Sequence, residues 1–102
     1  MTTTEVHWLP KAERDLNGMT SCYFRISPAL ADTLQHEVEQ IVVQLRQFPL
    51  SYASVATNLR RACLNRFPFA IFYRSSSNRV TIAAVLPQRS DPHFIRRSLQ
   101  KR

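Results

Sequence analysis

The sequence predicts an α+β domain in which a mainly antiparallel sheet is covered on one face by an antiparallel helical hairpin. Two observations predict it: two consecutive amphipathic stripes with helical spacing in the first half of the chain, and three β-rich runs in the second half. The chain has 102 residues, a length suited to one domain with one core. We therefore expect a single domain over 1–102, whose last part, 88–102, is a basic and partly disordered tail.

The first half supplies one strand and two helices. Residues 5–9 alternate polar and apolar side chains up to Pro10, which predicts a short strand followed directly by a helix. The stripe of that helix recurs every three or four residues, at Ala12, Leu16, Met19, Tyr23 and Ile26. Ser27 and Pro28 then predict the N-cap and first residue of a second helix, with a stripe at Leu30, Leu34, Val38, Ile41, Leu45 and Phe48. Pro49 ends it, so the predicted pair is a helical hairpin.

The second half supplies the sheet against which this hairpin packs. Three runs, 59–64, 69–74 and 80–86, have strand composition, and the middle run is almost wholly apolar, as in a central strand. Residues 75–78 have turn composition, so the last two strands form an antiparallel hairpin. Pro87 ends the sheet, and 94–99 are expected to form a short helix. The predicted order is strand, helix, helix, strand, strand, strand.

Composition excludes several classes of protein. The single glycine, Gly18, excludes a glycine-rich phosphate loop and a dinucleotide fingerprint, so we expect no cofactor of those kinds. The three histidines are scattered and no Cys/His pair has ligand spacing, so we expect no metal. The sequence has neither a membrane span nor a signal peptide, which predicts a cytoplasmic protein. In that reducing compartment Cys22 and Cys63 are expected to be small buried hydrophobes.

Charge is distributed unevenly along the chain. The net charge is +7, yet residues 1–57 hold four cations and six carboxylates, whereas residues 58–102 hold ten cations and one carboxylate, Asp91. Nine of those ten cations are arginines, whose planar guanidinium binds phosphate or carboxylate in a bidentate way. The asymmetry favours a polyanionic partner. We expect the partner to contact Arg60, Arg61, Arg74, Arg79, Arg89, Arg96 and Arg97.

Taken in order, several segments resemble the RelE/ParE superfamily of bacterial type II toxins, the plasmid stabilisation proteins. The resemblance spans nearly the whole chain. Its parts are Val6-His7-Trp8 with Pro10, Ala12 and Asp15-Leu16; Ser27-Pro28 with Leu30-Ala31; Leu45 and Phe48-Pro49; Leu59-Arg60-Arg61; Arg66 to Arg74; Val80 to Leu86; and Arg89-Ser90-Asp91-Pro92. It implies a growth-arresting toxin held by a cognate antitoxin in a hetero-oligomer, with operator DNA contacted only through the antitoxin and no membrane partner.

Two mechanisms are implied by this resemblance, and the fold does not choose between them. A RelE-like toxin cleaves mRNA on the ribosome, and the residues implied here are Arg61, Arg74, Arg89 and His93. Cleaving members place a tyrosine near the end of the chain, whereas no tyrosine follows Tyr73 in this sequence. Tyr73 itself is expected to be a core or sheet-edge residue and not a catalytic acid, because it ends the most apolar run.

The preferred hypothesis is therefore a ParE-like toxin that binds and poisons DNA gyrase without chemistry of its own. The first alternative is a ribosome-dependent mRNA interferase, in which case the chain is an enzyme. The second alternative is a non-toxic relic that binds its partner and regulates its own operon. Proton-transfer groups are scarce in the basic half, where His93, Tyr73 and Asp91 are the candidates, and this scarcity favours binding over cleavage.

Overall fold

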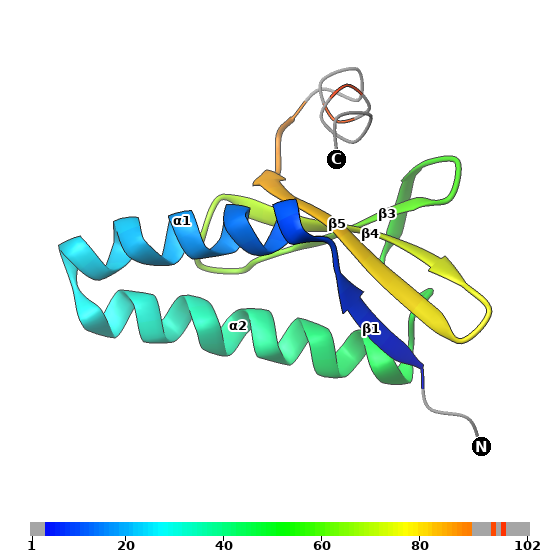
Figure 1. The fold of residues 1–102 in the computed structure, drawn as a ribbon, viewed down its shortest axis with the longest axis horizontal. Helices are drawn as coiled ribbons and strands as arrows, with labels where there is room; N and C mark the ends of the chain where they lie inside the picture. The colour runs from blue at the N-terminus through cyan, green and yellow to red at the C-terminus, as the bar shows by residue number, and fades with distance from the viewer. Residues whose placement is uncertain (1–3, 91–94, 96, 98–102) are drawn as a thin grey trace.

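The protein folds into a five-stranded mixed sheet with two helices packed on one face (Figure 1). The computed structural model describes residues 4–90, 95 and 97. In chain order the elements are β1 (Glu5–Trp8), α1 (Pro10–Ile26), α2 (Pro28–Gln47), β2 (Ala53–Ala56), β3 (Leu59–Cys63), β4 (Phe69–Ser76) and β5 (Arg79–Pro87). The predicted α+β class is confirmed, as are both helices and the four predicted strands.

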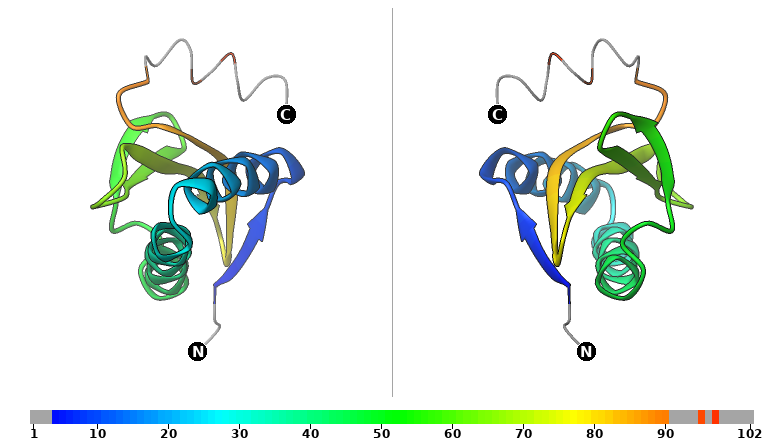
Figure 2. Two further views of the ribbon diagram at one scale, coloured as in Figure 1. Left: turned by 90° about the vertical axis from the view of Figure 1, so that its left-hand side faces the viewer. Right: turned by 90° about the vertical axis from the view of Figure 1, so that its right-hand side faces the viewer.

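The sheet has the strand order β1-β5-β4-β3-β2. β1 runs parallel to β5, and the other three pairs are antiparallel. The turn between β4 and β5 closes at Ser77, whose positive φ of 49° is tolerated in such a tight turn. Seen from the end, the helical hairpin lies on one side of the sheet, and neither α1 nor α2 covers the other face (Figure 2).

The structure contains one strand, β2, that the sequence does not predict. β2 is four residues long, Ala-Ser-Val-Ala, and has little of the alternating pattern that marks a strand. It forms because it pairs with β3, with Ala53 opposite Arg61 and Ala56 opposite Leu59, across a register shift. The strand conformation of β2 therefore depends on its pairing with β3, and local composition does not predict it. The helix expected over 94–99 lies outside the described residues except at Ile95 and Arg97.

The two helices begin and end where the prolines predict. Pro10 and Pro28 occupy the first turns of α1 and α2, where a missing backbone N–H is not costly. Ser27 separates the helices in an extended conformation and occupies the N-cap position of α2, although its side chain makes no cap hydrogen bond. Its backbone N–H instead donates to the Tyr23 carbonyl, which closes α1. Gly18 lies inside α1 without interrupting it.

The larger core lies between the helices and the sheet. Its buried residues come from α1, α2, strands β3 to β5 and the loop between β3 and β4. They are Ala12, Leu16, Leu34, Val38, Ile41, Leu45, Ala62, Leu64, Phe67, Ile71, Tyr73, Val80, Ile82 and Val85. A smaller cluster lies on the opposite face of the sheet, at Leu59, Ala70, Phe72, Ala84 and Ile95. The central strand β4 is thus buried on both faces, as its apolar run predicts.

The predicted apolar stripes of α1 and α2 both include residues that the rest of the protein does not cover. Ile26 and Phe48, at the far ends of the stripes, are 72% and 58% exposed. Cys22 and Cys63 are also exposed, so the expectation that both are buried is wrong. The reason is that α1 extends past the sheet that covers its first half and that Cys63 lies on β3 outside the core. The exposed apolar positions become available for contacts with another molecule.

Candidate interaction surfaces

The face of the sheet opposite the helices, here called the open face, gathers arginines from three strands. The register places Arg61 of β3 opposite Phe72, and Arg74 of β4 opposite Thr81 of β5. Because side chains alternate along a strand, Arg61, Phe72 and Arg74 project to the same side, and Arg61 and Arg74 are diagonal neighbours. Two residues before Thr81, Arg79 projects to that side as well. The open face therefore carries a diagonal row of three of the predicted arginines.

Arg60 and Arg61 point to opposite faces of β3, as the alternation of a strand requires. Arg60 Nη1 donates to the carbonyls of Tyr52 at 2.7 Å and Leu50 at 3.3 Å, and so holds the connection between α2 and β2. Arg61 Nη1 donates at 3.0 Å to the Gln88 carbonyl, on the segment that follows β5. Both arginines are partly buried, and each guanidinium keeps further N–H groups for a partner.

The remaining predicted site residues divide into exposed and undescribed positions. Arg74, Arg79, Arg89 and Arg97 are exposed. Of these, Arg79 approaches Glu5 at 3.9 Å, a distance typical of a weak surface ion pair. His93 and Arg96 lie outside the described residues.

Tyr73 belongs to the core and not to a surface. It is fully buried, and its hydroxyl donates to the Pro49 carbonyl at 2.7 Å. Burial raises the pKa of this phenol, an effect opposed by the nearby Arg60 charge and by a hydrogen bond from the Tyr52 backbone N–H. The ring also meets Tyr52 edge-on, at a centroid distance of 6.3 Å. The expectation that Tyr73 is a packing residue is confirmed.

A charged cluster of Glu5, His7 and Arg79 at the β1 end of the sheet was not predicted from the sequence. His7 Nε2 donates to Glu5 Oε2 at 3.0 Å, and the same oxygen is the one approached by Arg79. The hydrogen bond and charge of His7 are the main reasons that the pKa of Glu5 lies below its ordinary value of 4.5. Alternation along the predicted strand places Glu5 and His7 on the same side, but Arg79 joins them only through the parallel pairing of β1 and β5 in the folded sheet.

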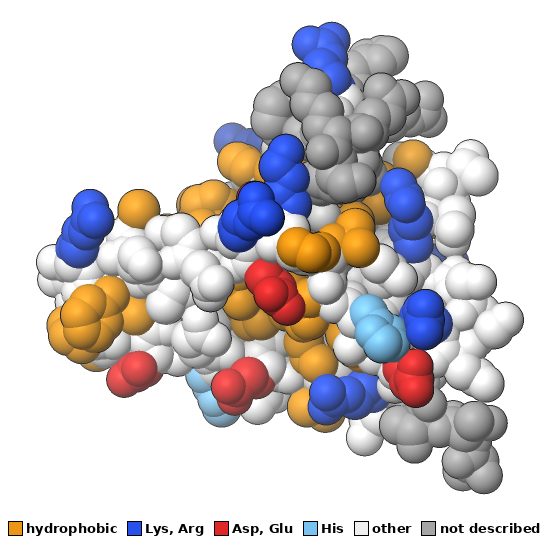
Figure 3. Space-filling model, viewed as in Figure 1, with side chains coloured by type: hydrophobic (Ala, Val, Ile, Leu, Met, Phe, Trp, Pro, Cys, Tyr) orange, Lys and Arg blue, Asp and Glu red, His pale blue; other side chains and the backbone are white. Residues whose placement is uncertain are grey.

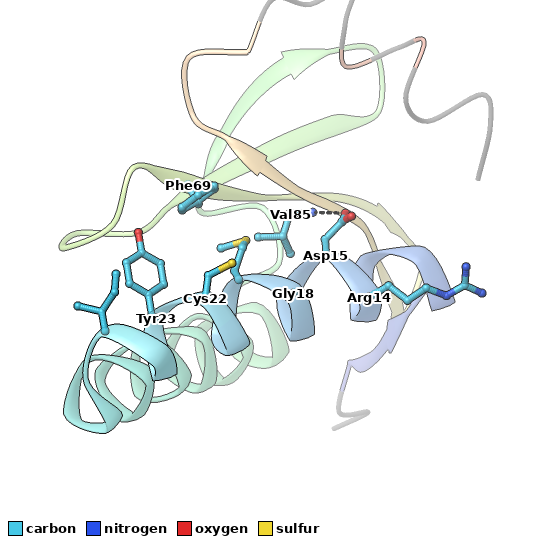
Figure 4. A pocket seen from close by; sticks show the side chains of 9 residues that line it. Arg14, Asp15, Gly18, Cys22, Tyr23, Phe69 and Val85 are labelled. Atoms are coloured by element: carbon cyan, nitrogen blue, oxygen red, sulfur yellow. Dashed lines mark hydrogen bonds between the residues drawn. The ribbon is translucent and has the colours of Figure 1, made fainter.

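A second surface is an open apolar groove between α1 and the ends of β4 and β5 (Figure 4). Its volume is about 640 Å³, and its lining comprises Arg14, Asp15, Gly18, Met19, Cys22, Tyr23, Ile26, Phe69 and Val85. Figure 4 shows Tyr23 and Cys22 projecting from α1 toward Phe69, whereas Arg14 extends away from them. At one end, Asp15 Oδ2 accepts a hydrogen bond from the Val85 backbone N–H at 3.1 Å. The other end opens beside Ile26.

Exposed apolar side chains continue from this groove around the end of the helical hairpin. Phe24, Ile26 and Leu30, on either side of the α1–α2 connection, are all exposed. In the space-filling view, hydrophobic side chains gather at that end of the hairpin, at the left of Figure 3. An exposed apolar area of this kind is typical of a protein-binding surface.

The described residues contain no arrangement typical of a metal site or a membrane protein. Among them, no three His, Cys, Asp or Glu side chains come together in a way that fits a metal ion. Over the same part of the chain, neither helix is long and apolar enough to cross a membrane.

The fold and its surfaces define a class, that of small basic α+β proteins with arginines on one face of the sheet and an exposed apolar groove beside a helix. Comparison with known proteins makes the class specific. A family model described as "ParE toxin of type II toxin-antitoxin system, parDE" matches residues 6–92. The chain therefore belongs to the ParE toxin family, as its resemblance to the RelE/ParE superfamily predicts.

A solved structure agrees in fold. A chain of the "Chromosomal ParDE TA system from P. aeruginosa" is 24% identical in sequence, with a TM-score of 0.71. The match covers 83% of this chain and 96% of that one. Among curated proteins, none matches the chain.

Proposed function

We propose that this protein is the toxin of a type II toxin–antitoxin system, that a cognate antitoxin neutralises it, and that it arrests growth by binding DNA gyrase. The observation that carries the proposal is the family match over residues 6–92. The surfaces support it, because they are suited to binding: arginines from three strands converge on the open face, and an apolar groove lies beside α1.

The antitoxin fits the apolar groove. A partner segment with apolar side chains would occupy the space between Tyr23 and Phe69 and extend over the exposed Ile26 and Phe24. Acidic residues of the same partner would meet the basic side chains that border these surfaces, including Arg14 at the groove. Apolar contact supplies affinity in such an interface, and charge supplies specificity and the rate of association.

Of the three proton-transfer candidates in the basic half, the structure describes only Tyr73, and its position favours binding without chemistry. Tyr73 is committed to the core, with its hydroxyl bonded to Pro49. General acid–base catalysis requires such groups within hydrogen-bond reach of the reacting atoms.

The second candidate, a ribosome-dependent mRNA interferase, rests on one specific observation. Arg61 and Arg74 are diagonal neighbours on the open face, and Arg89 follows β5 closely along the chain. Guanidinium groups so arranged suit the charge that develops on a phosphodiester during cleavage. In that case Arg61, Arg74, Arg89 and His93 are the residues whose replacement abolishes toxicity.

One experiment separates these functions. The chain is expressed alone in cells while growth is followed, and the mRNA of these cells is mapped by primer extension. In parallel, the purified toxin is added to gyrase supercoiling reactions and to translating ribosomes. Growth arrest with intact mRNA and inhibited supercoiling is the expected result. Discrete cuts within translated codons would instead establish the interferase, and unimpaired growth at normal expression would show a non-toxic, partner-binding protein.

Matched variants connect the result to the open face. Arg74→Gln and Arg79→Gln remove exposed charges from that face, so we expect weaker toxicity with the fold retained. Arg25→Gln, in the last turn of α1, removes one exposed positive charge elsewhere and serves as the control. Equal toxicity of all three variants would show that the open face does not contact the target.

A further inference from the structure

β2 (Ala53–Ala56) forms the edge of the sheet that lies opposite β1 (Figure 2). It is the last strand in the order β1-β5-β4-β3-β2, so only β3 pairs with it. Apart from the Ser54 hydroxyl, which donates to the Ala56 carbonyl at 3.1 Å, no described residue outside β3 hydrogen-bonds to the β2 backbone. The outer side of β2 is therefore free to pair with another strand.

This edge differs from the rest of a basic protein in carrying no charge. Residues 47–59, which include β2 and the segments on either side of it, are the longest stretch of the sequence without a charged side chain. Edge strands are commonly protected from pairing by lysines, prolines or bulges. β2 contains neither lysine nor proline, and its one feature of this kind is the register shift between Ser54 and Ala56. The β2 edge is therefore weakly protected against the addition of a strand.

Two large apolar side chains lie in solvent just before β2. Phe48 is 58% exposed and Leu50 is 63% exposed. The backbone that carries them is held in place, because the Tyr73 hydroxyl donates to the Pro49 carbonyl at 2.7 Å and Arg60 Nη1 donates to the Leu50 carbonyl at 3.3 Å. An ordered segment loses little conformational entropy when an interface covers it. The chain thus presents a preorganised apolar contact beside the free edge.

The absence of charge indicates the kind of partner. An acidic segment finds no counter-charge among residues 47–59, whereas a second copy meets the same uncharged surface without like-charge contact. Antiparallel pairing of a strand with its own copy is self-complementary about a two-fold axis. Arg61 lies one strand further in, on β3, so its two copies would be three strand spacings apart, about 14 Å. That distance exceeds the Debye length of about 8 Å at physiological ionic strength, so the net charge of +7 permits pairing here.

We propose that two copies of this chain pair antiparallel through their β2 edges and form a dimer with one continuous sheet, to which Phe48 and Leu50 add apolar contact. The two-fold axis of such a strand pair is perpendicular to the sheet, so both open faces lie on the same side of the dimer. Arg61, Arg74 and Arg79 of both copies then share one wide basic surface. The inference goes beyond the proposed function, because it holds whichever target the toxin has.

Sedimentation equilibrium of the purified full chain, over a series of concentrations, tests the dimer. We expect a reversible transition to twice the mass of the chain and no larger species, because a two-fold pairing is closed. The dimer is expected to be equally tight or tighter at about 0.5 M NaCl than at about 0.15 M, since salt screens the repulsion between two basic chains. A monomer at every concentration up to about 1 mM would overturn the proposal, and so would a dimer that salt weakens.

Amide hydrogen exchange locates the interface. The amides of β2 that point away from β3 are expected to exchange at least about ten times more slowly at concentrations where the dimer dominates, since a new hydrogen bond covers each. The amides of Glu5 and Leu9, which donate to carbonyls within the same copy, serve as the internal reference. Concentration-dependent protection of β1 without protection of β2 would place the contact at the other edge and overturn the proposal.

Ser54→Lys tests the free edge by charge. Ser54 is exposed in the single copy, and the substitution brings two like charges close together only when the β2 edges pair. We expect the dimer to dissociate at least about tenfold more readily. Ser54→Ala removes the same hydroxyl without adding charge, and Gln40→Lys adds the same charge at an exposed position of α2, so both are expected to dimerise normally. Equal dissociation constants for the two lysine variants would overturn the proposal.

Phe48→Ser tests the apolar contact, and Phe24→Ser is its matched control. The two phenyl groups are almost equally exposed, at 58% and 59%, but Phe24 lies at the far end of the helical hairpin. We expect a several-fold higher dissociation constant for Phe48→Ser and no change for Phe24→Ser. An equal or larger effect of Phe24→Ser would place the interface away from β2 and overturn the proposal.

Discussion

The carboxylate of Asp15 accepts a hydrogen bond from the backbone N–H of Val85, 70 residues further along the chain. β1 ends at Trp8, opposite Ile82, so β5 continues beyond the strand that pairs with it. α1 covers that continuation, and Asp15 supplies the acceptor that a longer β1 would have supplied. The contact fixes α1 against the sheet at one end of the apolar groove, so the groove depends on it.

Replacing Asp15 with alanine is expected to lower the free energy of unfolding by about 1–3 kcal/mol, because the partly buried Val85 N–H loses its acceptor. Urea denaturation measures the change, and faster exchange of the Val85 amide locates it. Asp32→Ala removes an exposed carboxylate from α2 and is expected to have little effect. A loss of the same size in both variants would contradict the assigned bond.

Tyr73→Phe tests the link between β4 and the connection that follows α2. The variant keeps the buried ring but removes the hydroxyl that donates to Pro49 and accepts from the Tyr52 backbone N–H. We expect a loss of about 1–2 kcal/mol in the free energy of unfolding, seen as a lower urea midpoint. Tyr23→Phe, at a half-buried ring packed edge-on against Phe67, is the matched control. No difference between the two variants would refute the structural role of the Tyr73 hydroxyl.

Glu37 holds the loop between β3 and β4 against α2. Its Oε1 accepts from the backbone N–H groups of Asn65 at 2.8 Å and Arg66 at 3.3 Å. Glu37→Ala is expected to cost about 1–2 kcal/mol and to speed amide exchange at Asn65, since both donors lose their acceptor. Glu37→Gln keeps an acceptor oxygen and is expected to leave exchange nearly unchanged. Fast exchange in Glu37→Gln would show that the negative charge, not the oxygen, orders the loop.

The His7–Glu5 pair gives a prediction about pH. Mainly through the hydrogen bond and charge of His7, the folded state holds the pKa of Glu5 below 4.5. The folded protein therefore releases this proton more readily than the unfolded chain, so the resulting stability is present above pH 4.5 and is lost as pH falls through the folded pKa. A ¹³C NMR titration of the Glu5 carboxyl should show a higher pKa in His7→Ala and a smaller rise in Arg79→Gln. A larger rise in Arg79→Gln would reverse the assigned causes.

Local patterns were sufficient for most of the fold. The spacing of Leu34, Val38, Ile41 and Leu45 gave α2 its buried face, and prolines at 10 and 28 placed the helix starts correctly. β2 was missed because its strand character comes from pairing with β3 and not from its own composition. The exposure of Ile26 and Phe48 was also missed, because a stripe shows which residues share a helix face but not where the covering surface ends.

The candidate surfaces depended much more on tertiary structure. Alternation along a strand was enough to send Arg60 and Arg61 to opposite faces. Their different partners, Tyr52 and Gln88, came from segments that only the folded sheet brings near. The same holds for Glu5 and Arg79, which meet because β1 lies parallel to β5, although two helices and three strands separate β1 from β5 along the chain.

The sequence by itself determined the α+β class, the helical hairpin, the charge asymmetry and the family. Each of these is a property of local periodicity, composition or ordered motifs. Tertiary structure alone decided which arginines share a face, which strand edge stays open and where the apolar groove lies beside Asp15 and Val85. The physical reason is that strand order and register arise from contacts between residues distant in the chain, whose combined burial and hydrogen bonding no local pattern contains.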